Sequence, residues 1–368
     1  MCADVTFLRQ HAVKLVASVL ITAGVIYTAH KGNLKLVPNG TDFDGIRWSS
    51  LALFVPLLLA MTWFRTVRWR FLLRSIIDVP KVRLLAVSCA GLLAVLLLPF
   101  RIGELARPYM LRTPNEARRA GEPVLTMTAA TSSIVAERVI DGVFLSVVLA
   151  LALVLVPTVQ PLPETVVGLP LKVSYVRAMG FAMLGVFSTA FVTIAVFYFA
   201  REWARRATRA VVGLVSPRLA DKLAEIAGHL ADGLHVFGRG RDFLGFLLET
   251  AAYWACNVFG MWVLAMGCGI VHGDGSAITF PEACALMGML GCTIMIPGPP
   301  GLFGVFQAGI YAGMTMYFPT SIVIGPGAAY VFLLYATQVV ITAITGAWGI
   351  WHEGGTRRLR GALVATSG

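Results

Sequence analysis

Long runs of apolar residues, separated by short charged stretches, recur along the whole chain. The runs are continuous and lack the polar–apolar alternation of barrel strands, so they indicate α-helices and exclude a transmembrane β-barrel. Their lengths suit segments that enter or cross the hydrocarbon core of a bilayer. The segments lie at about 12–29, 47–64, 84–99, 124–156, 177–199, 243–267, 281–297 together with 302–318, and 327–351. This pattern predicts an all-α polytopic membrane protein.

Clusters of arginine and lysine between the apolar segments orient them across the membrane. The stretches 65–83 and 201–241 and the tail after residue 351 are rich in arginine, whereas 157–172 and 268–280 are nearly uncharged. Positively charged loops remain on the cytoplasmic side of a membrane. We therefore predict a multi-pass protein of the cell (inner) membrane whose N- and C-termini are both cytoplasmic.

The segment 84–99 conflicts with this orientation if it crosses the bilayer, because the arginines at 101–119 would then lie outside. A re-entrant segment that turns at Pro99 and returns to the cytoplasm removes the conflict. A second segment broken by proline and glycine, IMIPGPPGLFGVFQ at 294–307, is predicted to form a matching hairpin from the outside. The chain is therefore expected to have eight membrane segments, namely six full spans and two opposed re-entrant hairpins.

The order span, span, hairpin, span occurs twice, in residues 1–160 and in residues 170–355. Inverted repeats with broken helices at matching positions are typical of transporters. We predict one membrane domain over residues 1–368, and we hold the inverted repeat as a hypothesis that rests on element order. The basic, amphipathic segment 201–241 is predicted to be a cytoplasmic linker between the halves, either an interfacial helix pair or an ordinary surface linker.

The composition supports a membrane protein, since 57% of the residues are hydrophobic and 13% are charged, against about a quarter charged in soluble domains. The net charge of +11 lies in clusters beside the apolar segments, which favours the anionic cytoplasmic leaflet as a partner over nucleic acid. The six cysteines include no CxxC pair, so we expect no disulfide, no metal site and no cofactor. The N-terminal run lacks a convincing cleavage site, which favours a retained first helix.

Two clusters of ionisable residues lie near the first hairpin, where each isolated charge would cost about 3 kcal/mol or more in hydrocarbon. The first cluster contains Arg101, Glu104 and Arg107, and the second contains Glu137, Arg138 and Asp141. The first cluster is rich in arginine and the second in carboxylates, so they have complementary charge. We predict that they converge as walls of one hydrated cleft that binds substrate. A purely structural or interfacial role for either cluster is the alternative.

The second hairpin contributes an uncharged stretch, PGPPGLFG at 297–304. Its glycines allow the backbone to unwind and to present amide donors to a phosphate or a lipid headgroup. Gln307 supplies a side-chain polar group next to the turn. We therefore add Gly298, Gly301 and Gln307 to the candidate binding residues, with a plain tight turn between two short helices as the alternative.

Three motifs occur together in one order: PFRIGELARPYML at 99–111, ERVIDG at 137–142 and PGPPGLFGVFQ at 297–307. In this combination the chain resembles the flippase-like membrane domain of the lysylphosphatidylglycerol synthase family along essentially its whole length. The resemblance implies movement of a lipid between leaflets. It does not imply the aminoacyl-transferase activity of the founding members, because we expect no transferase domain after the last predicted span. Many relatives have glutamate where Gln307 stands, so the resemblance does not imply a proton carrier there.

The leading hypothesis is movement, or flipping, of a polar-headed, phosphate-bearing envelope lipid between the two leaflets. Arg101 and Arg107 would hold the phosphate, because the guanidinium group binds phosphate in bidentate geometry. The carboxylates would balance these charges or contact a cationic headgroup. Membrane lipids are thus the expected ligands, and a separate lipid-modifying enzyme is an expected partner.

Two other functions remain open from the sequence. Asp42 and Asp44 in the first outer loop favour a membrane glycosyltransferase that uses a lipid-linked sugar, although such a pair is usually only solvated. A non-transporting accessory of envelope-lipid synthesis is the third hypothesis. The sequence contains no GxxxxGK[ST] loop, HExxH motif or serine-nucleophile motif, so we expect that the protein is not an enzyme.

Overall fold

A computed structural model describes residue 27 and residues 37–74, 76–112, 124–167, 172–212, 216–218, 221, 225, 240–295 and 299–366. These residues form α-helices and short 3-10 helices, and two isolated bridges in them do not extend into a sheet. The predicted first span, 12–29, and most of the predicted linker after Val212 lie outside the described residues.

The helices follow the apolar segments closely. The α-helices are α2 (Trp48–Val67), α3 (Trp69–Leu73), α4 (Lys81–Leu97), α5 (Ala106–Leu111), α7 (Met127–Leu155), α8 (Val173–Phe199), α9 (Arg201–Val212), α11 (Gly240–Gly267), α12 (Phe280–Met295), α13 (Val305–Tyr317), α14 (Thr320–Ile324) and α15 (Pro326–Thr366). The 3-10 helices are η1 (Gly40–Phe43), η2 (Pro99–Leu105) and η4 (Pro300–Leu302). Within the described part of the chain, four helical segments are long and apolar enough to cross a membrane, namely Trp48–Leu73, Met127–Leu155, Val173–Phe197 and Pro326–Gly354. The prediction of an all-α chain with several membrane-length helices is confirmed.

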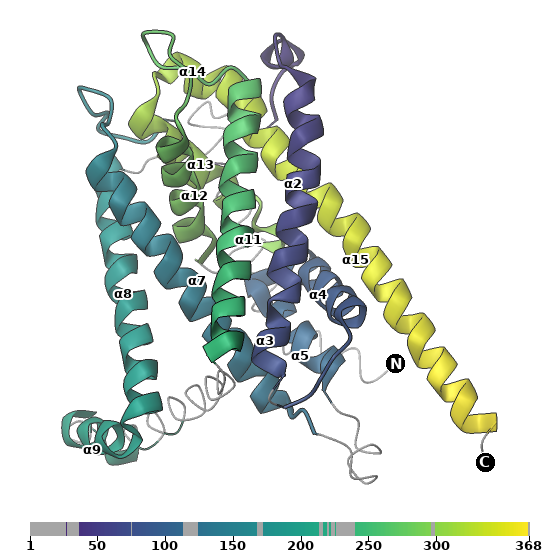
Figure 1. Cartoon of the computed structure of the whole chain (residues 1–368). Coiled ribbons are helices and arrows are strands. Elements are labelled where there is room, and N and C mark those ends of the chain that lie inside the picture. The colour runs from purple at the N-terminus through teal and green to yellow at the C-terminus, as the bar shows by residue number, and fades with distance from the viewer. Residues whose placement is uncertain are drawn as a thin grey trace.

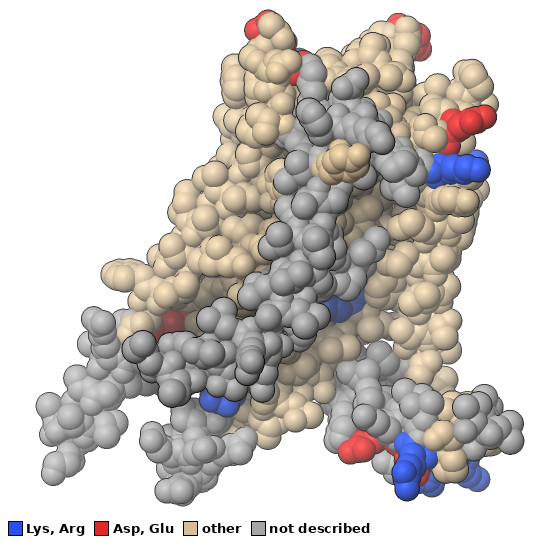
Figure 2. Space-filling model, turned by 180° about the vertical axis from the view of Figure 1, so that it is seen from behind, with Lys and Arg blue, Asp and Glu red and all other residues tan. Residues whose placement is uncertain are grey.

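The long helices define the two ends of the molecule. In Figure 1, α2, α7, α8, α11 and α15 run between the ends, whereas α12 and α13 occupy the upper half and α4 and α5 the lower half. Helix α9 lies across the lower end of α8. On the parts of the opposite face that Figure 2 shows in colour, most side chains between the ends are uncharged, and charged side chains gather at the lower end. Such a distribution suits a bilayer.

The first helical hairpin forms where Pro99 interrupts an apolar helix. Proline disfavours helical backbone at the residue before it, and Leu98 is accordingly extended, with φ −103° and ψ 139°. Helix η2 then packs back against α4, and α5 also contacts α4. Gly103 makes this return possible, because a Cβ atom there would overlap with the backbone of Ala94 and Val95.

Replacing Gly103 with alanine is therefore expected to destabilise the hairpin by about 1–3 kcal/mol, the usual cost of overpacking. The obstacle is backbone, which cannot rotate away as a side chain can. Thermal unfolding of the purified protein in detergent measures the effect. Gly185→Ala in α8 is the matched control, because no atom lies within 4 Å of a Cβ there. Equal melting temperatures for the two variants would show that the close approach at Gly103 does not matter.

The second hairpin joins α12 to α13 through the turn that contains η4, and its two helices pack on each other. The packing of the hairpins is reciprocal between the two parts of the chain. Helix α4 packs on α15, α12 packs on α7, and α2 packs on α11. Each hairpin thus lies against the last long helix of the other half. The two turns also meet, since η4 contacts both α4 and η2.

One part of the sequence interpretation is wrong. The stretch 65–83 was expected to be a charged loop, but its first residues continue α2 and form α3. Trp69, Leu72 and Leu73 are fully buried, and the indole Nε1 of Trp69 donates to Ser133 Oγ on α7 at 2.9 Å. Burial of these apolar side chains explains why the helix persists beyond the first arginine. The continued helix also places Arg68 in the interior.

Candidate functional site

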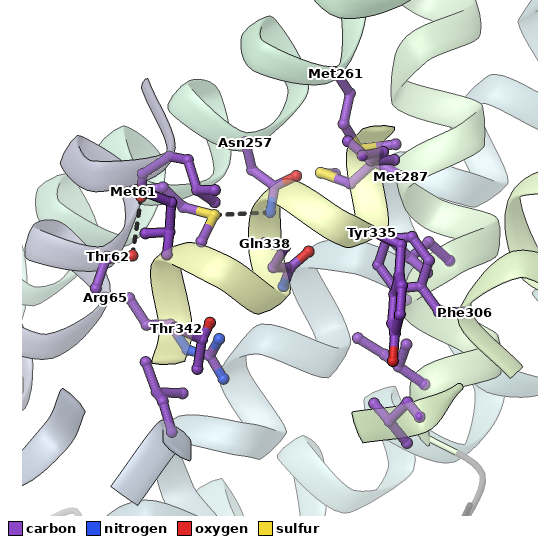
Figure 3. Close-up of a pocket in the computed structure, with 18 of the residues that line it drawn as sticks. Met61, Thr62, Arg65, Asn257, Met261, Met287, Phe306, Tyr335, Gln338 and Thr342 are labelled. Carbon is purple, nitrogen blue, oxygen red and sulfur yellow. Dashed lines mark hydrogen bonds between the residues drawn. The ribbon is translucent and has the colours of Figure 1, made fainter. Parts of the chain in front are cut away.

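A cavity of about 160 Å³ lies among α2, α4, α7, α11, α12 and α15, and both hairpin turns contribute residues to its wall. Much of its wall is apolar, with Met61, Met261, Met287 and Phe306 among the side chains drawn in Figure 3. Methionine is flexible and polarisable, and it adapts to ligands of irregular shape. The cavity is the natural candidate for a binding site in this part of the molecule.

Uncharged polar groups occupy one region of the cavity wall. Asn257 of α11 and Gln338 and Thr342 of α15 line the cavity together with Thr62 of α2 (Figure 3). Asn257 Nδ2 contacts Met61 Sδ at 3.2 Å. Tyr335 Oη donates to the carbonyl oxygen of Gly301 at 3.1 Å and so links α15 to the second hairpin turn.

Charged residues line another region of the same cavity. They are Arg65 from α2, Arg101 from η2, and Arg138 and Asp141 from α7. Three of the four are cations, and Arg65 makes no ion pair with any described residue. The cavity wall therefore carries a guanidinium group, that of Arg65, whose charge no described carboxylate balances and which is available to an anion.

A buried ion network formed by Arg68, Glu137 and Asp141 adjoins these charged lining residues. Arg68, Glu137 and Asp141 are 0%, 0% and 1% exposed, respectively. Arg68 binds Asp141 through two hydrogen bonds, with Nη1–Oδ1 at 2.7 Å and Nη2–Oδ2 at 2.6 Å. It also binds Glu137 Oε1 at 2.9 Å. Helix α11 completes the pocket of Arg68, because Thr250 Oγ1 accepts at 3.1 Å and the Tyr253 ring lies 4.9 Å from the guanidinium.

Arg138 and Arg107 complete the network from opposite sides. Arg138 Nη2 donates to Glu137 Oε1 at 2.8 Å, and its Nη1 lies 3.4 Å from Asp141 Oδ2. Arg107 is 6% exposed; its Nη1 lies 3.5 Å from Glu137 Oε2 and its guanidinium is 4.4 Å from the Trp69 ring. The stem of Arg107 crosses α4 where only Gly91 leaves room for it.

Arg101 and Glu104 form a separate pair on the first hairpin turn. Arg101 Nη2 contacts Glu104 Oε1 at 2.5 Å, and Arg101 Nη1 donates to the carbonyl oxygen of Ile294 at 3.0 Å. Ile294 lies at the C-terminal end of α12, where carbonyl groups lack helical partners and favour a cation. Arg101 has a φ of 57°, which is strained for a residue with a side chain. The turn holds this backbone in place and directs the guanidinium toward the second hairpin.

The structure thus joins the two predicted clusters through the contact of Arg107 with Glu137, and it places Arg101, Arg138 and Asp141 on the cavity wall. Among the described residues the group consists of five arginines and three carboxylates, so two of these arginine charges have no described carboxylate to balance them. The arginines are Arg65, Arg68, Arg101, Arg107 and Arg138, and the carboxylates are Glu104, Glu137 and Asp141.

The predicted residues of the second hairpin have different positions. Gly301 lines the cavity and has a φ of 64°. Gln307 is 2% exposed, and its Oε1 accepts from the amide of Gly304 at 2.6 Å. It caps the start of α13 and is not among the residues that line the cavity. Gly298 lies outside the described residues.

Of the acidic pair Asp42 and Asp44, which precedes α2, Asp42 has a local role. Asp42 Oδ2 accepts from the amide of Asn39 at 2.8 Å and caps η1. Neither Asp42 nor Asp44 lines the cavity. Over the described ranges, no group of three His, Cys, Asp or Glu side chains has a spacing that would hold a metal ion.

Arg65 and Arg68 are the residues that the sequence interpretation missed. They lie in WFRTVRWR, directly after an apolar run, and were counted as loop charges. A usable signal was present, because Arg65, Arg68 and the preceding Met61 and Leu58 recur at helical spacing. Aromatic residues directly before Arg65 and directly after Arg68 also indicate burial more than solvation.

The comparisons with known proteins give one match. The chain matches the family model described as "Lysylphosphatidylglycerol synthase TM region" over residues 15–346. No curated protein and no solved structure matches it. The matched range contains all three motifs and both hairpins, so the resemblance seen in the sequence is confirmed. The chain is a multi-pass membrane protein and belongs to the family of the lysylphosphatidylglycerol synthase TM region.

Proposed function

We propose that this protein moves a phosphate-bearing envelope lipid between the leaflets of the cell (inner) membrane, with the headgroup passing through the central cavity. The observation that carries the proposal is the excess of two arginine charges in a cluster beside that cavity. Uncompensated cations are expensive within a membrane domain unless an anion or water joins them. A phosphate group supplies the missing charge and suits the guanidinium geometry.

The cavity residues divide into binding and supporting roles in this proposal. Arg65, Arg101 and Arg138 hold the phosphate, because they line the cavity. Glu104, Glu137, Asp141 and Arg107 fix the arginines in place through the ion pairs described above. Gly301 forms part of the wall, and Gln307 supports the second turn.

The proposal includes a topology of six full spans and two opposed re-entrant hairpins in one domain over residues 1–368. The reciprocal packing of α4 on α15 and of α12 on α7 supports an inverted repeat of halves 1–160 and 170–355. Such repeats bind substrate where their broken helices meet, and here η2 meets η4 beside the cavity. Both termini and the basic linker 201–241 face the cytoplasm, where α9 rests on the anionic leaflet.

Cysteine labelling tests this topology. Single cysteines at Thr113 and Gly273, in a background without the native cysteines, are treated in whole cells with an impermeant maleimide. Gly273→Cys is expected to react, because it lies in the exposed loop before α12, and Thr113→Cys is expected to stay unlabelled until the cells are opened. Labelling of Thr113→Cys from outside would disprove the first re-entrant hairpin.

No covalent step is part of the proposal. A separate lipid-modifying enzyme makes the lipid, and this protein changes its leaflet. The capping role of Asp42 accounts for the acidic pair without glycosyl transfer.

Reconstitution into liposomes tests the function. Proteoliposomes that contain labelled anionic phospholipids are expected to move them between leaflets faster than protein-free liposomes, without a change in lipid mass. Arg65→Gln is expected to abolish the difference, because it removes a cavity cation that has no ion pair with any described residue. Arg206→Gln, on the exposed face of α9, is the matched control and should transport normally. A change in lipid mass would instead indicate a transferase, and no movement of any anionic lipid would refute the proposal.

A further inference from the structure

We propose that the transported headgroup is a phosphodiester whose far end is uncharged and hydroxylated, such as a glycerol or a sugar, and not a cationic aminoacyl group. This inference rests on the proposed function and names the class of substrate for the same cavity. Two independent features of the described cavity support it, namely the engagement of its carboxylates and the nature of its uncharged polar wall.

The first feature is that the carboxylates of the site already have cationic partners. Asp141 is the one carboxylate among the described residues that line the cavity, and it receives two hydrogen bonds from Arg68. Glu104 is paired with Arg101, and Glu137 has arginines on both oxygens. An ammonium group that entered the cavity would meet uncompensated arginines and find no unpaired carboxylate among the described residues. Repulsion between an ammonium group and arginines that line the same cavity of a membrane domain is strongly unfavourable.

The second feature is a set of neutral hydrogen-bonding groups beside the guanidinium groups. Arg65, Thr342, Gln338 and Asn257 follow one another along the cavity wall (Figure 3). The carboxamide of Gln338 makes no hydrogen bond to any described residue, and the Oδ1 atom of Asn257 is likewise without a described partner. A carboxamide offers both donors and an acceptor, which matches a hydroxyl group that donates and accepts.

Aromatic packing gives this region a fixed shape. The Tyr335 ring lies 5.2 Å from the Phe306 ring and 5.8 Å from the Phe303 ring, measured between centroids. Its hydroxyl group is held by the Gly301 carbonyl, so the ring presents an apolar surface beside Gln338. A glycerol or sugar combines hydroxyl groups with C–H surface and therefore suits a wall of amides next to an aromatic ring.

Lipid binding to the purified full-length protein in neutral detergent tests the inference without any substitution. The probes are phosphatidylglycerol, phosphatidylethanol, which has the same charge but no hydroxyl group, and lysyl-phosphatidylglycerol, which is cationic. Two neutral hydrogen bonds of about 0.7 kcal/mol each correspond to roughly tenfold in affinity. Phosphatidylglycerol is therefore expected to bind about tenfold more tightly than phosphatidylethanol, and lysyl-phosphatidylglycerol more weakly than either, as measured by the shift in melting temperature on titration.

Two substitutions locate the preference in the cavity. Gln338→Leu and Asn257→Leu keep side-chain volume and remove hydrogen-bonding groups. Each should weaken the binding of phosphatidylglycerol several-fold and leave the binding of phosphatidylethanol unchanged. Arg65→Gln should weaken the binding of both anionic lipids, whereas Arg206→Gln on α9 should change the binding of neither. Deacylated glycerophosphoglycerol is the soluble counterpart and is expected to bind at least tenfold more weakly than the lipid, because it lacks the acyl chains.

The outcomes separate the inference from the proposed function. Equal binding of phosphatidylglycerol and phosphatidylethanol, or tightest binding of the lysyl lipid, would overturn the uncharged, hydroxylated headgroup and leave lipid movement standing. The phosphate site itself would be refuted if anionic lipids bound no more tightly than phosphatidylcholine, or if Arg65→Gln left their affinity unchanged. If glycerophosphoglycerol bound as tightly as phosphatidylglycerol, the headgroup class would stand, but the ligand would be a soluble phosphodiester and not a lipid.

Discussion

Replacement of Arg68 with methionine is expected to lower the free energy of unfolding by about 3–5 kcal/mol, the usual cost of breaking a buried ion pair. Methionine fills a similar volume but leaves Asp141 without its two hydrogen bonds and Glu137 without one. All three residues are at most 1% exposed, so water does not replace the lost partner. Thermal or denaturant unfolding in a mild detergent measures the difference.

Arg70→Met is the matched control for this prediction. Arg70 lies two residues further along the same polypeptide and pairs with Glu249 at 2.8 Å, but both side chains are 18% exposed. A partly solvated pair contributes about 0–1 kcal/mol. Adding Asp141→Asn to Arg68→Met should recover part of the loss, because the stranded charge is then removed and the effects are not additive. Equal losses for Arg68→Met and Arg70→Met would contradict the structural role assigned to the network.

The position of Arg68 shows where inference from sequence reaches its limit. Apolar runs of membrane length predicted the long helices, because every backbone polar group within a bilayer requires a partner and a helix supplies it locally. The end of α2 could not be found in the same way. Arginines after an apolar run indicate the cytoplasmic boundary in most chains, but Trp69 and two leucines extend the helix here and bury the guanidinium of Arg68.

Local breaks in the sequence were more informative than charge counts. Pro99 and the glycines of PGPPGLFG marked both turns, because these residues restrict or free the backbone directly. Complementary charge also predicted that the segments of Arg107 and Glu137 converge, and Arg107 Nη1 lies 3.5 Å from Glu137 Oε2. Sequence spacing did not show that Gln307 caps α13, because that contact depends on the backbone of Gly304 at a φ of 83°.

Substitution of lysine for Arg101 and for Arg107 is expected to separate phosphate binding from structural support. Lysine retains the charge but loses the planar fork and the stacking surface of arginine. The side chain of Arg101 lines the cavity and is 18% exposed, whereas the side chain of Arg107 is 7% exposed and is not among the lining groups. We therefore expect Arg101→Lys to reduce lipid movement about tenfold or more, since a charge-assisted hydrogen bond contributes about 1.5–3 kcal/mol. Its melting temperature should remain close to that of the unsubstituted protein.

Arg107→Lys should have the opposite profile. The guanidinium of Arg107 stacks on Trp69 at 4.4 Å, and loss of a desolvated stacking contact costs about 1–2 kcal/mol. An ammonium group at this position still balances Glu137, so the arginines that line the cavity keep their places and the folded fraction should transport nearly normally. Lipid movement and thermal unfolding are measured on the same proteoliposome preparations. If Arg107→Lys transports as poorly as Arg101→Lys at unchanged stability, Arg107 contacts the headgroup. If Arg101→Lys transports normally, the phosphate is not held by the first hairpin turn, and Arg65 and Arg138 alone remain to bind it.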